Sequence, residues 1–245
     1  AVSILADLPR PSRSEIVNVS DVSEAEIVRF CSQAWPNRRR DWIESRWKWM
    51  YLASAKRLNV EPRVWLFEDQ GRIVGHHGAQ FVRFKMGERE HVTAWLVETM
   101  VLEEYRERGV GPQLVMQSQV DMPFNLSLGQ TPQMRSILEK LGWLRVAPLE
   151  TYVFMFNATR VLKQKIPAPL APVAAAWFQL RRVAHQVRGK QTALPMTVRT
   201  IDRFGAEYDE LWTRVSACYG CATVRDAAYL NWKYVEQPGQ SFIRL

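Results

Sequence analysis

A strand that runs through a glycine-bearing turn into a helix is the part of this sequence whose chemistry can be named first. It spans residues 100–114, with Gly109 and Gly111 in the turn. Glycines let the backbone curl so that successive N–H groups point at one spot, and the helix adds the positive end of its dipole. We therefore expect a cradle for a pyrophosphate, to which Arg106 and Arg108 add positive charge. On glycine spacing alone, a turn that holds no ligand is the alternative.

The cysteines offer a second chemistry, which the sequence does not favour. Cys31, Cys218 and Cys221 are an odd number in a chain of 245 residues, which argues against a disulfide framework and fits a reducing compartment. Cys218 and Cys221 form a lone CxxC, and zinc would need two further ligands at a readable spacing. We expect ordinary reduced thiols, no metal site and a cytoplasmic location. No run is long and apolar enough for a membrane span, and residues 1–15 do not resemble a signal peptide.

The formal charge of +8 could suggest a protein that binds nucleic acid. However, eight of the 33 basic residues lie between Thr151 and Ile201, where there is no Asp or Glu, so the remaining 25 equal the 25 acidic residues. We therefore expect no chain-wide basic surface and no nucleic-acid partner.

The elements that must position the glycine turn follow from local patterns. Asp69-Gln70-Gly71-Arg72 joins two β-rich runs and is typical of a hairpin. Further strands are expected at 15–20, 93–102 and 125–128, and residues 144–156 should supply closing strands. Helices are expected at 21–35, 42–58, 109–119 and 132–141. This order of elements predicts an α+β fold with a mainly antiparallel sheet flanked by helices.

Two signatures in this order resemble the GNAT acyltransferase superfamily. The run RERGVG, residues 106–111, fits the pattern R/Q-x-x-G-x-G/A, and the later helix ends in Lys140-Leu-Gly-Trp143, like the family's second signature. The resemblance covers about residues 14–157. It implies acyl-CoA as co-substrate, held by a pyrophosphate cradle and by a strand that pairs with the pantetheine arm. The donor-binding residues so implied are Met100, Val101, Leu102, Arg106, Arg108, Gly109, Val110 and Gly111.

The resemblance also implies a mechanism in which an amine attacks the thioester, which asks for a base and an acid. Glu98 lies where many family members place a carboxylate, so it is the base candidate; binding a substrate cation or a strand neighbour is the alternative. The family's usual acid, a tyrosine, falls at Leu138, and an asparagine often seen earlier falls at Thr131. The sequence departs from the family at both positions.

Several side chains could replace the missing acid. Tyr105 precedes the cradle and is the second catalytic candidate, and Tyr152 lies on an expected closing strand. His76 and His77 have opposite faces on one strand, so one of them should point toward the substrate groove, although a structural role is the alternative. Aromatic residues fall where the family forms its acceptor wall, but their spacing also fits a core: Trp42, Trp47, Trp49 and Tyr51.

Residues 158–196 form an expected linker with one basic helix. The prolines between Pro167 and Pro172 exclude a helix interior, whereas Val173 to Val187 carry an apolar stripe with arginines beside it or at its end. Packing on a folded domain is the first interpretation. Peripheral contact with an anionic membrane is the second.

Residues 197–245 repeat residue spacings from the opening of the chain. Arg40-Asp41 and Trp47-Lys48-Trp49 have the spacing of Arg225-Asp226 and Trp232-Lys233-Tyr234. We predict an incomplete second GNAT-like repeat, with strand, helix, helix and strand in order and with Trp232 buried as Trp47 is.

Three functions remain open at this stage. The first is an enzyme that N-acylates a small-molecule or sugar amine, and the second is a non-catalytic module that binds acyl-CoA or acts as a scaffold. The third, which rests on the basic helix alone, is a peripheral membrane enzyme that acts on a lipid or a lipid-linked sugar. The departures at Leu138 and Thr131 favour the second, and the intact glycine turn suits the first and the second.

Overall fold

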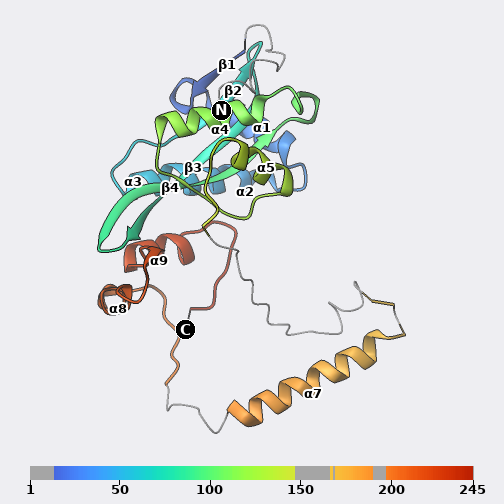
Figure 1. Cartoon of the computed structure of the whole chain (residues 1–245), viewed down its shortest axis with the longest axis vertical. Helices are drawn as coiled ribbons and strands as arrows, with labels where there is room; N and C mark the ends of the chain where they lie inside the picture. The colour runs from blue at the N-terminus through green and yellow to red at the C-terminus, as the bar shows by residue number, and fades with distance from the viewer. Residues whose placement is uncertain (1–13, 147–165, 168, 190–196, 245) are drawn as a thin grey trace. The chain divides into compact units, whose positions relative to one another are not determined.

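The computed structural model describes residues 14–146, 166–167, 169–189 and 197–244 (Figure 1). By its contacts the chain divides into two compact units, one of Ala1–Leu144 with Thr200–Leu245 and one of Arg145–Arg199. The C-terminal segment thus belongs to the same unit as the expected N-terminal domain. The boundaries predicted from the sequence, 14–157, 158–196 and 197–245, stay predictions.

A six-stranded sheet is the framework of the first unit. The order is β1-β2-β3-β4-β5, and β6 pairs with the distal part of β3. All neighbours are antiparallel except β4 and β5, so the sheet is mixed but mainly antiparallel, as expected. The closing strands expected at 144–156 lie almost wholly outside the described residues. The strands are β1 (Ser14–Asn18), β2 (Val64–Asp69), β3 (Arg72–Met86), β4 (Arg89–Val101), β5 (Leu126–Ser127) and β6 (Cys221–Thr223).

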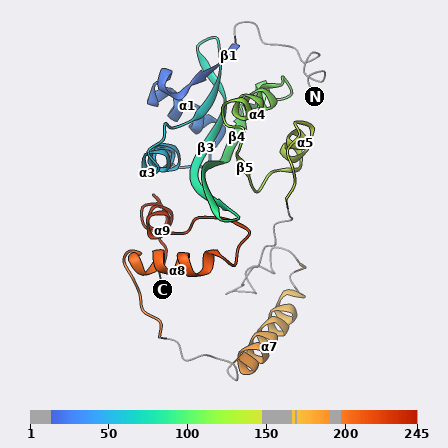
Figure 2. The ribbon, with the colours of Figure 1, turned by 60° about the vertical axis from the view of Figure 1, so that its left-hand side comes forward.

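Helices cover both faces of this sheet. In Figure 2, α1 and α3 lie on one side of β3 and β4, and α4 lies on the other. The expected helices are confirmed to within a few residues. Their bounds are α1 (Glu24–Ala34), α2 (Arg40–Trp47), α3 (Ser54–Arg57), α4 (Val110–Asp121) and α5 (Pro132–Lys140), with 3-10 turns η2 (Val19–Asp21) and η4 (Glu103–Tyr105).

Local sequence explains where several elements begin and turn. Ser23 and Glu26 form a reciprocal capping box, which starts α1 after Asp21 rather than at it. Between β2 and β3, Gln70 and Gly71 both have positive φ, 52° and 76°, as a two-residue hairpin turn requires.

The expected helix at 42–58 contains a π-helix, η3 (Lys48–Ala53), between α2 and α3. Its three consecutive residues Trp49, Met50 and Tyr51 are all buried. A helix that packs on one side only cannot bury three successive side chains, so η3 contacts neighbours on more than one side.

The C-terminal segment matches its prediction in part. Two helices are present, α8 (Ala206–Ser216) and α9 (Ala227–Tyr234), and Trp232 is buried as Trp47 is. The strands expected at the two ends of the segment are wrong: residues 197–204 and 241–244 contain no strand, and one backbone bond joins them, from Ile201 N–H to the Arg244 carbonyl. The duplication itself stays a prediction.

This segment docks on the first domain through buried aromatic rings. The indole rings of Trp49 and Trp232 stack with centroids 4.8 Å apart. Each indole N–H donates to the other residue's backbone carbonyl, at 2.8 Å from Trp49 and 3.2 Å from Trp232. β6 extends the sheet beside β3, and Asp226 forms an ion pair with Arg83. Ring stacking, a strand ladder and an ion pair therefore hold residues 200–244 in place.

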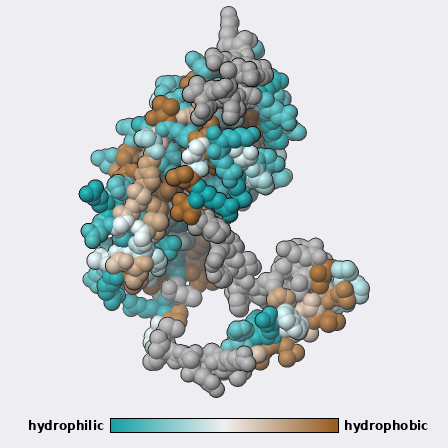
Figure 3. All heavy atoms as spheres, in the orientation of Figure 1, coloured by the Kyte–Doolittle hydropathy of each residue, from teal (hydrophilic) through white to brown (hydrophobic). Residues whose placement is uncertain are grey.

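The second unit contains α7 (Ala171–Gly189), which includes the expected helix at 173–187. Figure 3 shows apolar side chains along α7, and Val173, Trp177, Leu180 and Val183 are exposed there. None of the helices in the described ranges has the length and apolar character of a membrane span.

We predict that Trp232→Ala destabilises the first unit by about 3–5 kcal/mol, because it removes a fully buried indole together with the hydrogen bond that its N–H donates to the Trp49 carbonyl. Urea denaturation measures the change. Trp177→Ala, at a half-exposed tryptophan of α7, is the control and should change stability by less than about 0.5 kcal/mol. Equal effects of the two substitutions would show that the C-terminal segment is not docked as described.

Candidate functional site

The strand β4 is irregular just before it reaches the glycine turn. Val97 pairs with Gly78 and Met100 with His76, so Glu98 and Thr99 together oppose His77. Glu98 has a φ of 54°, in the left-handed region that residues other than glycine rarely adopt. This is a β-bulge, a feature that re-aims a side chain.

The bulge turns the Glu98 carboxylate toward the helical face that carries α2 and η3. Arg38, in the loop before α2, lies 2.9 Å from Oε1, and Arg46 of α2 lies 3.2 Å from the same oxygen. The hydroxyl of Tyr51 in η3 donates to Oε2 at 3.2 Å. The Glu98 side chain is only 14% exposed. Three hydrogen-bond donors from three different segments therefore contact one largely buried carboxylate.

The ionisation of Glu98 follows from this arrangement. Burial by itself raises the pKa of Glu98, but the nearby charges of Arg46 and Arg38 act in the opposite direction and the pKa ends below its ordinary value. Glu98 is therefore a carboxylate anion at neutral pH. A carboxylate with a lowered pKa is a weak base, so it would accept a proton from an amine less readily than an unpaired one.

The other titratable groups of this cluster are neutral. Burial, then the charge of Glu98, hold the pKa of Tyr51 well above its ordinary value and raise that of Cys31 to about 12. Burial also lowers the pKa of His76, whose Nδ1 lies 3.0 Å from the Glu98 carbonyl oxygen. The ionised groups at the bulge are thus one carboxylate and two guanidinium ions.

Both histidines of β3 are buried, which corrects the expectation that one points into an open groove. The hydroxyl of Ser118 donates to the Val115 carbonyl, so His77 donates from Nε2 to Ser118 and accepts from Thr99 at Nδ1. Burial lowers the pKa of His77 to about 3. His77 is therefore a neutral side chain whose hydrogen bonds connect β3 to β4 and to α4.

The expected acceptor wall is mostly core. Trp47, Trp49 and Tyr51 are buried, and the Tyr51 ring lies so close to Gly78 that a β-carbon there would overlap it. Trp42 differs, because it is half-buried and its ring lies 5.6 Å from the guanidinium carbon of Arg38.

The glycine turn has the geometry predicted for a cradle. Gly109 is in the left-handed conformation, φ 78°, immediately before α4. Among the hydrogen bonds of the described residues, none uses the N–H of Gly109, Val110 or Gly111. Arg106 and Arg108 are exposed beside them. Free N–H groups at the start of a helix are a feature to which anions commonly bind, so the expected cradle stays a prediction at this turn.

The strand that leads to the turn has an open edge. β5 pairs with β4 only at Trp95 and Leu96, so in the described residues β4 continues from 97 to 101 with a neighbour on the β3 side alone. The Leu102 N–H donates to Val74, and alternation then turns the backbone groups of Val101 toward the open edge. Of the expected pantetheine-pairing residues 100–102, Val101 is the one with backbone groups free to pair.

Tyr105 lies apart from the Glu98 cluster. Its hydroxyl donates to Asp69 at 2.8 Å, and this bond raises the pKa of Tyr105. The guanidinium carbon of Arg108 lies 4.9 Å from the Tyr105 ring centroid. The structure therefore brings Tyr105 together with the turn, and it does not join Tyr105 to Glu98 by any contact among the described residues.

The two departures from the family pattern have structural explanations. Leu138 is buried, and Thr131 caps α5 by accepting a hydrogen bond from the Met134 N–H. Tyr152 lies outside the described residues. The missing tyrosine is thus replaced by a packing residue and the missing asparagine by a helix cap.

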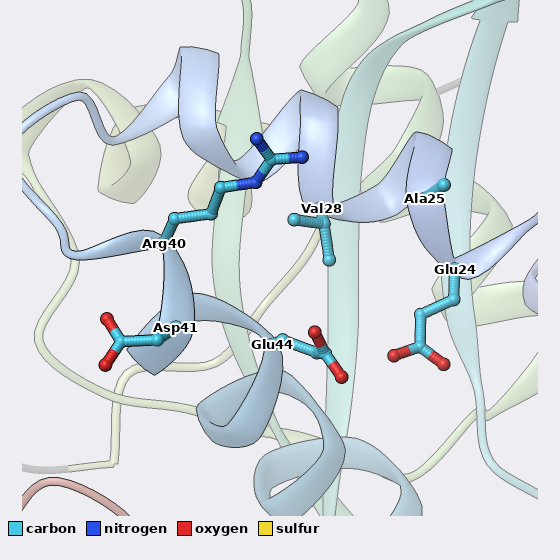
Figure 4. Close-up of a pocket in the computed structure, with 6 residues that line it drawn as sticks. All are labelled: Glu24, Ala25, Val28, Arg40, Asp41 and Glu44. Atoms are coloured by element: carbon cyan, nitrogen blue, oxygen red, sulfur yellow. The ribbon is translucent and has the colours of Figure 1, made fainter.

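A separate hollow of about 740 Å³ lies between α1 and α2 (Figure 4). Lys48 lies 2.6 Å from Glu24 and 2.8 Å from Glu44, two of the acidic residues in its wall. The hollow shares no lining residue with the Glu98 cluster or the glycine turn. Its lining residues are Glu24, Ala25, Val28, Arg40, Asp41 and Glu44.

Sequence reasoning identified Glu98 but missed the residues that hold it. Arg38 and Arg46 are 60 and 52 positions away along the chain, and Tyr51 was read only as core or wall. The available signal was the basic run Arg38-Arg39-Arg40, which comes just before the aromatic residues expected to form an acceptor wall.

Comparison with known proteins agrees with the expected domain. Residues 26–121 match the model of the acetyltransferase (GNAT) family, so the expected GNAT acetyltransferase domain is supported over that range. The second signature, at 140–143, lies outside the match. A search of curated proteins gave no match.

Solved structures that resemble part of this chain have low sequence identity to it. One is the aminoglycoside N-acetyltransferase AAC(6')-Iy in complex with CoA, which is 18% identical over 60% of this chain and 98% of its own, with a TM-score of 0.45. A Trypanosoma brucei acetyltransferase is 16% identical over 58% and 99%, with a TM-score of 0.42. A GNAT family acetyltransferase from Brucella melitensis, in complex with acetyl-CoA, is 16% identical over 54% and 84%, with a TM-score of 0.39.

We predict that Glu98→Gln costs less stability in acid than at neutral pH. Because folding lowers the pKa of Glu98, the carboxylate's contribution is complete above its unfolded pKa of about 4.3 and is lost as the pH falls through the lower folded value. The free energies of unfolding of wild type and variant, measured in urea from neutral pH downward, should converge below that range. Glu61→Gln, at an exposed glutamate, is the control. A difference that does not change with pH would contradict the ion-paired state of Glu98.

Proposed function

We propose that this protein is an acyl-CoA-dependent N-acyltransferase that moves an acetyl or other acyl group to an amine of a small molecule or sugar. The observation that carries the proposal is that the chain leads from the open edge of β4 to Gly109 and the free N–H groups at the start of α4. The family match over residues 26–121 supports it.

The donor fits this path from end to end. Its pyrophosphate would lie on the N–H groups of Gly109, Val110 and Gly111, with Arg106 and Arg108 beside it. The pantetheine arm would pair with Val101 as an added strand does. Successive residues of a strand advance by roughly 3.3 Å, so the arm would run back along β4 and bring the thioester near Glu98.

The reaction forms a bond between the amine nitrogen and the acyl carbon and breaks the bond from that carbon to sulfur. The amine loses a proton and the leaving sulfur gains one. Glu98 is the proposed acceptor of the amine proton, acting through water, because its oxygens already accept from Arg38, Arg46 and Tyr51. An alkyl thiol has a pKa of about 8.5, so the thiolate can leave near neutral pH without a dedicated acid. The bond from Tyr105 to Asp69 weighs against Tyr105 in that role.

The second candidate is a non-catalytic module that binds acyl-CoA. The burial of Leu138 and the capping role of Thr131 favour it, since both positions serve structure rather than proton transfer. The two functions differ in one measurable property. An enzyme releases free thiol from acetyl-CoA only when a suitable amine is present and yields the acylated amine by mass, whereas the module stabilises with CoA and releases no thiol with any amine.

We predict that Gly109→Glu abolishes CoA binding, because the carboxylate repels the pyrophosphate and a side chain is strained at φ 78°. The readout is the thermal stabilisation of the protein by CoA. Gly220→Glu adds the same charge where a β-carbon meets open space and should keep that stabilisation. If Gly109→Glu is stabilised as strongly as wild type, the cradle is assigned wrongly.

We predict that Glu98→Gln lowers kcat by about 100-fold with little change in CoA affinity, since the proposed base acts on the amine while the backbone holds the donor. Thiol release at saturating acceptor measures the rate, and calorimetry measures CoA binding. A rate within about twofold of wild type would exclude Glu98 as the base.

A further inference from the structure

The Glu98 cluster carries an excess of positive charge. Arg38 and Arg46 share one carboxylate, and the neighbouring Tyr51 and His76 are neutral at pH 7. The side-chain nitrogen of Lys233, in α9, lies 5.4 Å from the Trp49 ring, and burial and then the charge of Arg46 lower the pKa of Lys233. The site is thus cationic by at least one charge, at the end of β4 where the proposed acceptor would arrive.

Both guanidinium groups have donors to spare. Each carries five N–H bonds and gives one hydrogen bond to Glu98. The Nε of Arg46 is buried and has no hydrogen-bond partner among the described residues. The side chains of Arg38 and Arg46 are 27% and 20% exposed, so part of each one is open to solvent.

Aromatic rings fix the orientation of these two groups. The guanidinium carbon of Arg38 lies 4.3 Å from the Trp35 ring, and that of Arg46 lies 5.1 Å from the Trp42 ring. Trp42 is itself held, because its indole N–H donates to the Pro238 carbonyl at 3.0 Å. Stacked guanidinium groups are ordered before a ligand arrives, which favours bidentate contacts to an anion.

We propose that Arg38 and Arg46 bind an anionic oxygen group, a carboxylate or a phosphate, on the amine that accepts the acyl group. This inference rests on the proposed function, because it assigns the acceptor's chemical class at the same site. A dicationic amine would be repelled, since the two arginines already neutralise Glu98. An amine with an anionic group a few bonds away would place that group on the arginines and its nitrogen beside Glu98.

Matched pairs of acceptors test the proposal. An amino acid is compared with its amide, and an amino sugar with its phosphate ester, together with a simple diamine. We expect kcat/KM to be at least about 10-fold higher for the anionic member of one pair, because a charge-assisted contact is gained. Preference for the amino acid identifies a carboxylate, and preference for the phosphate ester identifies a phosphate.

The variant Arg38→Gln makes the test specific. Arg38 lies in a loop and is the safer substitution, whereas Arg46 ties α2 to β4. We expect the ratio of kcat/KM between the anionic and neutral members to fall about 10- to 100-fold in Arg38→Gln. Arg29→Gln removes the same charge from the exposed face of α1 and is the control, in which the ratio should stay within about twofold of wild type. An unchanged ratio in Arg38→Gln would overturn the proposal.

Failure of this inference can be told apart from failure of the proposed function. If kcat/KM is the same for neutral, cationic and anionic amines, the proposed function is supported and the proposed anion site is overturned. If no amine releases thiol, the same panel is titrated by calorimetry into the CoA-bound protein. Tighter binding of the anionic members, weakened in Arg38→Gln, would support the anion site in a non-catalytic protein, and binding that ignores charge would overturn it.

Discussion

The carboxylate of Glu98 is largely buried, and a buried anion is stable only when hydrogen-bond donors surround it. Three segments satisfy this requirement by supplying Arg38, Arg46 and Tyr51. The bulge in β4 aims the carboxylate at them, and Gly78 leaves room for the Tyr51 ring to come within reach. The positions of the helices over this face of the sheet are therefore linked to one side chain on β4. Removing Glu98 would leave Arg38 and Arg46 without the anion that both of them contact.

The same constraint separates the two halves of the proposed site. The glycine turn needs only local backbone geometry, because Gly109 and the first turn of α4 create the N–H groups by themselves. The acceptor side needs residues that are distant in sequence and fixed by tertiary packing. A donor site of this kind can stay intact while the acceptor side changes.

Sequence could predict what depends on neighbours along the chain. The Gln70-Gly71 turn and the turn at Gly109 follow from local rules and were found where expected, and α1 begins within three residues of its expected start. The partners of Glu98 could not be predicted, because no local pattern joins positions some fifty residues apart. The strands expected at 197–204 and 241–244 were wrong, since β-propensity needs a partner strand and an apolar surface to be expressed.

The paired indoles of Trp49 and Trp232 have a consequence for how this chain could be divided or inherited. Each indole N–H donates a hydrogen bond to the other residue's backbone carbonyl, and both rings are buried. The surface of η3 and that of α9 are therefore each complete only when the other is present. A GNAT domain cut free at its expected boundary would expose an apolar face on η3 and the edge of β3 that β6 covers. Loss of the segment after residue 200 would therefore destabilise the rest of the first unit. A substitution at the contact surface of one part therefore calls for a compensating substitution in the other.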